Sequence, residues 1–217
     1  AEALYDLPPF GNVSLLHMTD CHAQLLPIYF REPNVNLGVG SMRGNAPHIV
    51  GEGFLKHFGI RPGSLEAHAF TYLDFVEAAK TYGKVGGFAH LSTLVKKMKA
   101  SRLGALLLDG GDTWQGSGTA LWTNAQDMVD ACKLLGVDVM TLHWESSYGA
   151  ERVKEIEEKD FAGKIDIVAQ NVKTTDFEDP VFKPYVIKNI NGVPVAIVGQ
   201  AFPYTPIANP RWHTPDW

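Results

Sequence analysis

Short apolar runs, separated by stretches with helical spacing, restrict the fold of this 217-residue chain more than any other feature. Such runs are typical of strands that are buried on both faces of a parallel sheet. Strands that alternate with helices indicate βαβ units, so we expect an α/β domain with a substantially parallel sheet. The apolar runs cover residues 13–18, 105–108, 137–142 and 165–169.

The stretches between these runs carry the signals of helices. Phe88 begins a series of apolar residues at helical spacing that ends at Met98, with lysines on the opposite face. Asn124 is expected to cap a helix that stops at Gly136, because Asn is favoured at N-caps and Gly at C-terminal stops. A charged surface helix is expected over residues 151–159.

Two segments depart from this alternation. Asn191-Gly192 joins the apolar runs 185–190 and 193–198 and predicts a β-hairpin. Residues 27–84 are rich in Gly, Pro and Asn, and we expect them to form an irregular insertion, which in compact domains is usually functional or mobile. The arginines of this segment are either part of the wall of a substrate groove or solvated surface: Arg31, Arg43 and Arg61.

The overall composition excludes several classes of protein. A net charge of -5 and a pI near 5.9 argue against nucleic-acid binding, which normally requires a basic face. No apolar run approaches the ~18 residues needed to span a bilayer, and the first residues lack the pattern of a signal peptide. The two cysteines, Cys21 and Cys132, are too few for a disulfide framework, and both are expected to pack in the interior.

Polar clusters follow four of the expected strands. In open α/β sheets the ligand crevice lies outside the carboxyl ends of the strands, so one site could collect all four clusters. Asp20 and His22 are two residues apart, and on an extended segment they would project to the same side and bind one metal ion. Mixed carboxylate and imidazole ligands suit Mn, Fe or Zn. Each cluster taken alone is more often a polar loop or a turn. The clusters are Asp20-Cys21-His22, Asp109–Asp112, His143–Glu145 and Gln170-Asn171.

The order of these clusters resembles that of a known superfamily. Asp20-x-His22, then Gly111-Asp112, then the triplet 143–145 resemble the motifs of the metallophosphoesterases. The stretches VGGFAHLSTLVKKM and LLLDGGDTWQGS are similar to the 5′-nucleotidase branch. More specifically, TDCHAQLLP, the 27–84 insertion, HWE and QNVKTTDFEDPVFKPY resemble the SoxB family of sulfate thiohydrolases.

This resemblance implies an αββα sandwich catalytic domain with two manganese ions. By position, Asp20 and His22 would hold one ion and Asp112 would bridge both. His143 stands where the superfamily has a ligating Asn, so we expect it to bind the second ion. Asn171 would line the edge of the substrate site, or alternatively cap a strand end.

Two positions of the 143–147 segment depart from the nucleotidase pattern. Trp144 stands where nucleotidases have a His that assists the leaving group, and Ser147 stands where an Asp orients that His. Indole does not titrate and is only an N–H donor. A thiolate is a much weaker base than an alkoxide and leaves with less help from an acid, so Trp144 fits cleavage of a sulfur–sulfur bond. Alternatively, Trp144 packs in the core.

The implied reaction is hydrolysis of a cysteine S-thiosulfonate on a periplasmic, SoxYZ-like sulfur carrier protein, which releases sulfate. Two alternatives are a 5′-nucleotidase-like phosphohydrolase and a non-catalytic carrier-binding fragment. The later ligands of the superfamily, a single His and a Gly-His-x-His motif, do not occur in residues 1–217. We therefore expect this chain to be the N-terminal part of a catalytic domain, with the missing histidines on the remaining part of the same protein.

Overall fold

The computed structural model describes residues 7–29, 38–71 and 73–217, and these divide into two compact units. The first unit consists of the chain up to Leu26 together with Gly87–Trp217, and the second is Pro27–Gly86. Arg31, which was considered as a groove residue, lies outside the described residues.

The first unit is built on a parallel sheet of four strands in the order β1-β4-β5-β6. The expected α/β class is therefore confirmed. The paired strands are shorter than the apolar runs that predicted them. Around β5, for example, Val137 and Leu142 are as buried as the two paired residues but lie outside the ladder. The strands are β1 (Leu15–Met18), β4 (Leu106–Asp109), β5 (Val139–Met140) and β6 (Asp166–Ile167).

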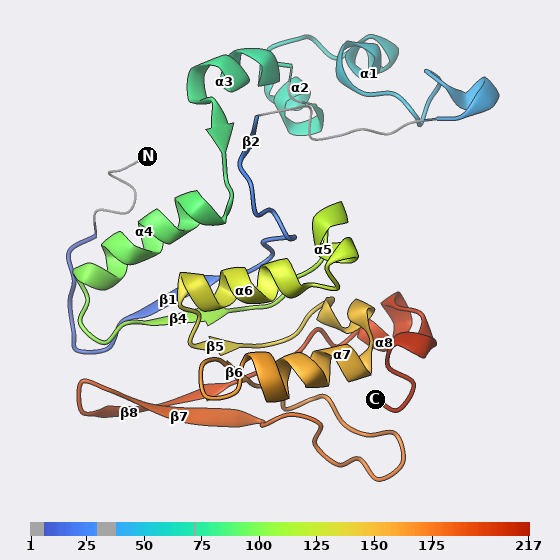
Figure 1. The fold of residues 1–217 in the computed structure, drawn as a ribbon. Helices are drawn as coiled ribbons and strands as arrows, with labels where there is room; N and C mark the ends of the chain where they lie inside the picture. The colour runs from blue at the N-terminus through green and yellow to red at the C-terminus, as the bar shows by residue number, and fades with distance from the viewer. Residues whose placement is uncertain (1–6, 30–37, 72) are drawn as a thin grey trace. The chain divides into compact units, whose positions relative to one another are not determined.

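Helices cover one face of this sheet (Figure 1). Gly136, with φ of 82°, ends α6 as expected. The expected cap at Asn124 is wrong, because Asn124 and Ala125 are both left-handed and no side chain caps α6. The helices of this unit are α4 (Phe88–Ala100), α5 (Gly118–Trp122), α6 (Gln126–Leu135), α7 (Ala150–Glu155), continued by a π-helical turn Ile156–Asp160, α8 (Thr205–Ala208), and two 3-10 helices, Glu145–Tyr148 and Arg211–His213.

A β-hairpin lies on the other side of the sheet from α4 and α6 (Figure 1). Its strands, β7 (Tyr185–Ile190) and β8 (Val193–Val198), have the predicted bounds. Asn191 and Gly192 have φ of 52° and 84°, as a two-residue turn that matches strand twist requires. A cavity of about 150 Å³ separates the end of β8 from β4 and β5. The described residues thus supply three layers, α, β and β, of the expected sandwich.

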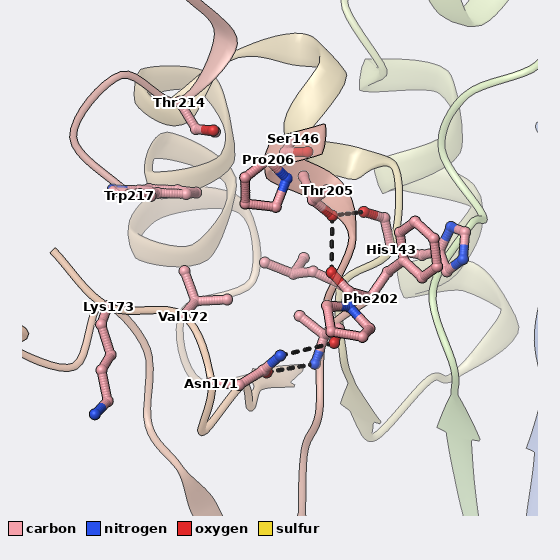
Figure 2. A pocket seen from close by; sticks show the side chains of 13 residues that line it. His143, Ser146, Asn171, Val172, Lys173, Phe202, Thr205, Pro206, Thr214 and Trp217 are labelled. Atoms are coloured by element: carbon pink, nitrogen blue, oxygen red, sulfur yellow. Dashed lines mark hydrogen bonds between the residues drawn. The ribbon is translucent and has the colours of Figure 1, made fainter. Parts of the chain in front are cut away.

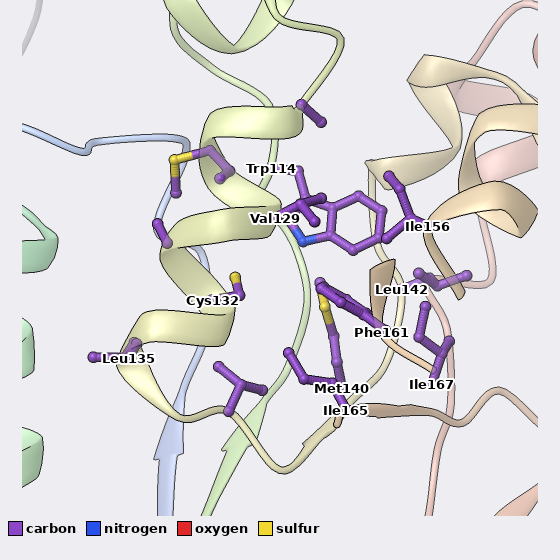
Figure 3. Packing of buried hydrophobic residues seen from close by; sticks show 14 of the residues in the cluster. Trp114, Val129, Cys132, Leu135, Met140, Leu142, Ile156, Phe161, Ile165 and Ile167 are labelled. Carbon is purple, nitrogen blue, oxygen red and sulfur yellow. The ribbon is translucent and has the colours of Figure 1, made fainter. Parts of the chain in front are cut away.

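The hydrophobic core fills the space between the helices and the parallel sheet (Figure 3). At its centre the fully buried Trp114 meets Phe161 edge to face, with ring centroids 5.6 Å apart. Trp114 lies two residues after Asp112, so the core anchors the loop that carries this candidate ligand. Edge-to-face aromatic pairs contribute about 0.5–1.5 kcal/mol beyond the area they bury.

The second unit is more regular than the sequence indicated. The segment that was expected to be irregular contains three helices, and the expectation was wrong because short helices need only local signals. Ser64, for example, caps α2 by accepting a hydrogen bond from the backbone N–H of Ala67. Arg43 and Arg61 are exposed. The elements are β2 (Ile28–Tyr29), which pairs with β3 (Lys84–Val85), a 3-10 turn Gly40–Met42, and helices α1 (Gly51–Phe58), α2 (Leu65–Phe70) and α3 (Phe75–Tyr82).

None of the helices in the described part of the chain combines the length and the apolar character that crossing a membrane requires.

Asn191 fastens the hairpin turn to the rest of the first unit. Its amide Nδ2 donates to the carbonyl oxygens of Asn12 and Leu103, both at 2.8 Å. Asn191→Gly keeps the left-handed turn but removes both bonds. We expect it to lower the free energy of unfolding by about 1–2 kcal/mol in urea denaturation. Asn191→Asp tolerates the same backbone but points a carboxylate at two carbonyls, so it should cost more. Unchanged unfolding in both variants would contradict this role.

Candidate metal centre

The loops that follow β1 and β4 are joined by main-chain hydrogen bonds. The N–H groups of Asp20, His22 and Ala23 donate to the carbonyl oxygens of residues 111, 112 and 113, at 2.9, 3.0 and 2.9 Å. These bonds continue the pairing of β1 with β4 beyond the last ladder residues. They hold Asp20 and His22 beside Asp112 at the carboxyl ends of the two strands.

Three candidate ligands form one compact group. The ligand atoms of Asp20, His22 and Asp112 all lie within 4.8 Å of one another. His22 Nε2 is 3.3 Å from Asp112 Oδ2 and 3.9 Å from Asp20 Oδ1. One cation could therefore be held by two carboxylates and an imidazole, a donor set that suits Mn, Fe or Zn.

His143 approaches the same carboxylate from the other side. Its Nδ1 is 3.4 Å from Asp112 Oδ2, so this oxygen lies within reach of two imidazoles on two different loops. Asp112 Oδ1 and His143 Nδ1 are buried and have no hydrogen-bond partner among the described residues. Buried polar atoms are usually satisfied, and a metal ion would satisfy these two. The residues therefore fit a centre in which Asp112 is shared by two ions.

The backbone at the ligands is left-handed. Asp20, His22 and Asp112 have φ of 55°, 48° and 59°. The expectation that Asp20 and His22 lie on an extended segment was wrong, although the two side chains do meet. Residues other than Gly in this region cost of order 1–3 kcal/mol each and cluster at functional sites.

Two glycines allow the loop after β4 to pass close to both neighbouring loops. A Cβ at Gly110 would lie 2.8 Å from Thr19 Oγ1, and a Cβ at Gly111 would lie 2.9 Å from the backbone nitrogen of His143. Gly111 also has φ of 89°. Side chains at these two positions would push apart the loops that carry the ligands.

The carboxylates of the group differ in their electrostatic surroundings. Burial raises the pKa of Asp112, while the nearby His22 and His143 act in the opposite direction. The hydroxyl of Thr19 donates to Asp20 at 2.5 Å and, as the largest cause, lowers the pKa of Asp20. Asp20 is thus held as an anion ready for a cation.

Asn171 is engaged away from the ligand group. Its Oδ1 accepts the N–H of Ala201 at 2.8 Å and its Nδ2 donates to the carbonyl of Ala201 at 2.9 Å (Figure 2). This arrangement corresponds to the alternative role of Asn171 as a strand-end cap, and it uses one of the two hydrogen bonds that each amide atom can form. Asn171 does line a cavity of about 180 Å³, together with His143 and Phe202, whose ring stacks on that of His143 at 4.2 Å.

Trp144 lies beside the ligand group and is partly buried. Its ring centroid is 6.3 Å from that of His143. Among the described residues, the hydrophobic core cluster does not include Trp144. Ser147 donates its backbone N–H to the carbonyl of Trp144 at 2.9 Å within the 3-10 helix.

Neither cysteine is placed for nucleophilic chemistry. Cys21 packs against the core, and burial raises the pKa of its thiol to about 11, so the thiol stays protonated at neutral pH. Cys132 is fully buried on α6. Both observations agree with the expectation that they are packing residues.

Two buried acids beside the candidate ligands belong to the polar clusters of the sequence, but no role was predicted for either of them. Asp109 is 3% exposed, and Glu145 is fully buried. Asp109 directly follows the apolar run 105–108 and Glu145 lies three residues after the run 137–142, and this position near a strand end was the available signal. Burial first, and then the charge of Glu145, raise the pKa of Asp109 to about 7. Asp109 Oδ1 accepts from the backbone N–H of Gly111 and the hydroxyl of Thr113, whereas Oδ2 is buried without a partner.

The raised pKa of Asp109 predicts a pH-dependent stability in the metal-free protein. Because the folded-state pKa of about 7 exceeds the ordinary 3.8, this group's contribution to stability is fully present below about pH 4 and is lost as pH rises through 7. Asp109→Asn stays neutral at every pH. Thermal unfolding in a chelator should show it stabilised by about 1–3 kcal/mol near pH 8 and much less near pH 5. Equal effects at both pH values would contradict the burial argument.

Known proteins resemble this chain in sequence and in fold. No protein-family model matches the chain. Rat 5′-nucleotidase is 30% identical over 132 residues, which are 58% of this chain and 23% of that protein. The 2′,3′-cyclic-nucleotide 2′-phosphodiesterase/3′-nucleotidase of Haemophilus influenzae is 29% identical over 137 residues, 57% of this chain and 20% of that protein. The chain thus spans about a fifth to a quarter of these relatives.

Solved structures give a longer match. The sulfate thiohydrolase SoxB of Thermus thermophilus superposes with a TM-score of 0.72 and 36% identity, over 97% of this chain and 39% of that chain. The NAD nucleotidase of Haemophilus influenzae (TM-score 0.57, 19% identity, 90% and 27% covered) and a calcineurin-like phosphoesterase of Bacillus subtilis (TM-score 0.55, 17% identity, 94% and 52% covered) share the fold. The chain therefore has a metallophosphoesterase-type fold and is similar, over nearly its whole length, to part of a SoxB.

Proposed function

We propose that this chain is part of a two-metal hydrolase that removes the terminal sulfonate, as sulfate, from a cysteine S-thiosulfonate on a sulfur carrier protein. The observation that carries the proposal is the position of Asp112 Oδ2, 3.3 Å from His22 Nε2 and 3.4 Å from His143 Nδ1. A carboxylate between two imidazoles on separate loops is suited to bridge two cations. The similarity to SoxB directs the choice of substrate.

The residues divide naturally between two ion positions. Asp20 and His22 would hold one ion with Asp112, and His143 would hold the other with the same carboxylate. Manganese is the ion that the resemblance implies, and the carboxylate and imidazole donors suit it. When bound, such a pair of ions lowers the pKa of a water molecule and stabilises negative charge on substrate oxygens.

The presence of Trp144 at this position favours a reaction with a sulfur leaving group over one with an alkoxide leaving group. In the proposed reaction a water oxygen forms a bond to the sulfonate sulfur and the sulfur–sulfur bond breaks. The carrier keeps the bonding electron pair as a sulfur anion, and the water protons pass to solvent with release of sulfate. A sulfur anion leaves with little help from an acid. The indole beside His143 offers bulk and one N–H donor instead of a titrating group.

The remaining parts of the proposal rest on the resemblance. The two-metal site would be completed by histidines from a further part of the same protein. The substrate would be a modified cysteine of a SoxYZ-like carrier, and the reaction would belong to periplasmic thiosulfate oxidation.

A 5′-nucleotidase-like phosphohydrolase is the second candidate, because the relatives found by sequence are named as nucleotidases. Cleavage of a nucleotide by the metal-loaded complete protein would favour it. A carrier-binding fragment without catalysis is the third candidate, and absence of bound metal in the complete protein would favour it.

The bridging role of Asp112 predicts how metal content responds to substitution. In the complete protein we expect about two transition-metal ions per molecule, as in other two-metal hydrolases. Asp112→Ala should lose both, because one carboxylate serves both ions. Elemental analysis that finds full metal in Asp112→Ala would rule out bridging.

His143 is tested by a pair of variants. His143→Ala should release one ion more readily than the other, since Asp20 and His22 remain. His143→Asn should restore part of the lost binding, because an amide oxygen is the ligand that the wider superfamily uses. Equal metal content in the two variants would mean that His143 is not a ligand.

Trp144 is the residue that we expect to favour sulfur–sulfur cleavage over phosphate-ester cleavage. Trp144→His combined with Ser147→Asp supplies an imidazole that can protonate an alkoxide. General acid assistance is typically worth ~10²–10⁴-fold, so the double variant should gain phosphate-ester hydrolysis over a low background. Thiohydrolase activity should fall, because the indole beside the substrate is lost. Both activities are measured at equal metal content. Nucleotide cleavage by the parent protein, or a double variant that gains none, would refute this role.

A further inference from the structure

The Glu145 carboxylate joins two loops that carry candidate ligands. Its side chain is fully buried at the start of the 3-10 helix that follows β5. Oε1 accepts the backbone N–H of Thr113 at 2.7 Å and lies 3.5 Å from that of Trp114. Oε2 accepts the backbone N–H of His143 at 2.7 Å. One oxygen therefore serves the loop of Asp112, and the other serves the loop of His143.

One other hydrogen bond in the described parts of the chain joins these two segments farther from the candidate ligands: Tyr148 Oη donates to the carbonyl of Trp114 at 2.9 Å. The ladder between β4 and β5 ends where Thr141 donates its N–H to the carbonyl of Asp109. Beyond that point, residues 110–114 are joined to residues 142–145 only through the Glu145 carboxylate. Burying a carboxylate is costly unless it is well hydrogen-bonded, and bonds from N–H groups to an anion are roughly twice as strong as neutral ones.

The loop of Asp20 and His22 is held in a different way. Its attachment to the Asp112 loop is made mostly by main-chain hydrogen bonds from Asp20, His22 and Ala23, with one longer bond of 3.3 Å from the Thr19 hydroxyl to the carbonyl of Gly111. None of these bonds involves Glu145. The two candidate ion positions therefore depend on different supports: mostly main-chain pairing on one side of Asp112, and on the other side the Glu145 carboxylate, with Tyr148 farther along the segment.

We propose that Glu145 is a positioning residue that fixes the distance between Asp112 and His143, and thereby sets the affinity of the ion these two residues share. The inference rests on the proposed two-metal site and adds that only one of its two ion positions depends on Glu145. Loss of the carboxylate lowers the affinity for the ion between Asp112 and His143. The affinity for the ion held by Asp20 and His22 stays nearly the same.

The test is a Mn²⁺ titration of the complete, metal-stripped protein and of Glu145→Gln, followed by calorimetry and electron paramagnetic resonance. Gln keeps the shape but presents an NH₂ group to one of the N–H donors. We expect the weaker of the two Mn²⁺ affinities to fall by about 10–100-fold, the usual effect of removing a residue that orients a ligand. The other affinity should change by less than about threefold, and the signal of coupled manganese ions should disappear.

Asp138→Asn is the matched control. Asp138 Oδ2 also bridges two segments, accepting from the backbone N–H of Leu107 at 2.7 Å and from Lys99 Nζ at 2.9 Å. Asp138 lies before β5, away from the candidate ligands, whereas Glu145 lies after β5 beside them. Loss of the Asp138 carboxylate should therefore lower thermal stability and leave both Mn²⁺ affinities unchanged. If Glu145→Gln does not fold, Glu145→Asp replaces it. The shorter carboxylate keeps the charge but cannot span both loops, and the same single affinity should fall.

Each outcome decides the question. Unchanged affinities in Glu145→Gln, or an equal loss of both affinities with a lower melting temperature, would overturn the positioning role. A parent protein that binds no pair of ions, or whose binding does not respond to Asp112→Ala, would instead refute the proposed two-metal function. The two failures are therefore distinguishable in one series of titrations.

Discussion

The candidate centre depends on how closely the loop after β4 approaches the loops on either side of it. A Cβ at Gly111 would lie 2.9 Å from the backbone nitrogen of His143, and a Cβ at Gly110 would lie 2.8 Å from Thr19 Oγ1. Neighbouring strands are about 4.8 Å apart, so loops that continue from them meet only where side chains are absent. Trp114 then anchors the same loop in the core. Tight packing and glycine together bring residues more than a hundred positions apart into one group.

Local patterns were sufficient to predict the scaffold. The hairpin bounds follow from alternation and from Asn191-Gly192, which fixes the register by itself. The parallel sheet follows from apolar runs that alternate with helices. Asp20, His22, Asp112 and His143 could be named because strand ends of a parallel sheet share one edge. Their roles as ligands stay predictions.

The parts that were missed depend on partners distant in the sequence. Asn171 forms hydrogen bonds with the backbone of Ala201, thirty residues later, and the sequence around Asn171 contains no signal for that contact. The role of Glu145 depends on a hydrogen bond from the backbone N–H of Thr113, which lies on another loop. The left-handed backbone at Asp20 arises from bonds to the loop after β4, whereas the sequence alone suggested an extended continuation of β1. In each case tertiary contacts override a local preference.

The left-handed backbone at three of the candidate ligands also limits how this group of residues can change during evolution. At positive φ, Asp, Asn and His are tolerated several-fold better than most residues, and β-branched side chains are nearly barred. Few residue types can therefore replace Asp20, His22 or Asp112, whichever metal is available. His143 is not among the described residues with positive φ. Of the four candidate ligands, His143 is thus the one at which the backbone leaves the choice of side chain open, and drift in metal preference should begin there.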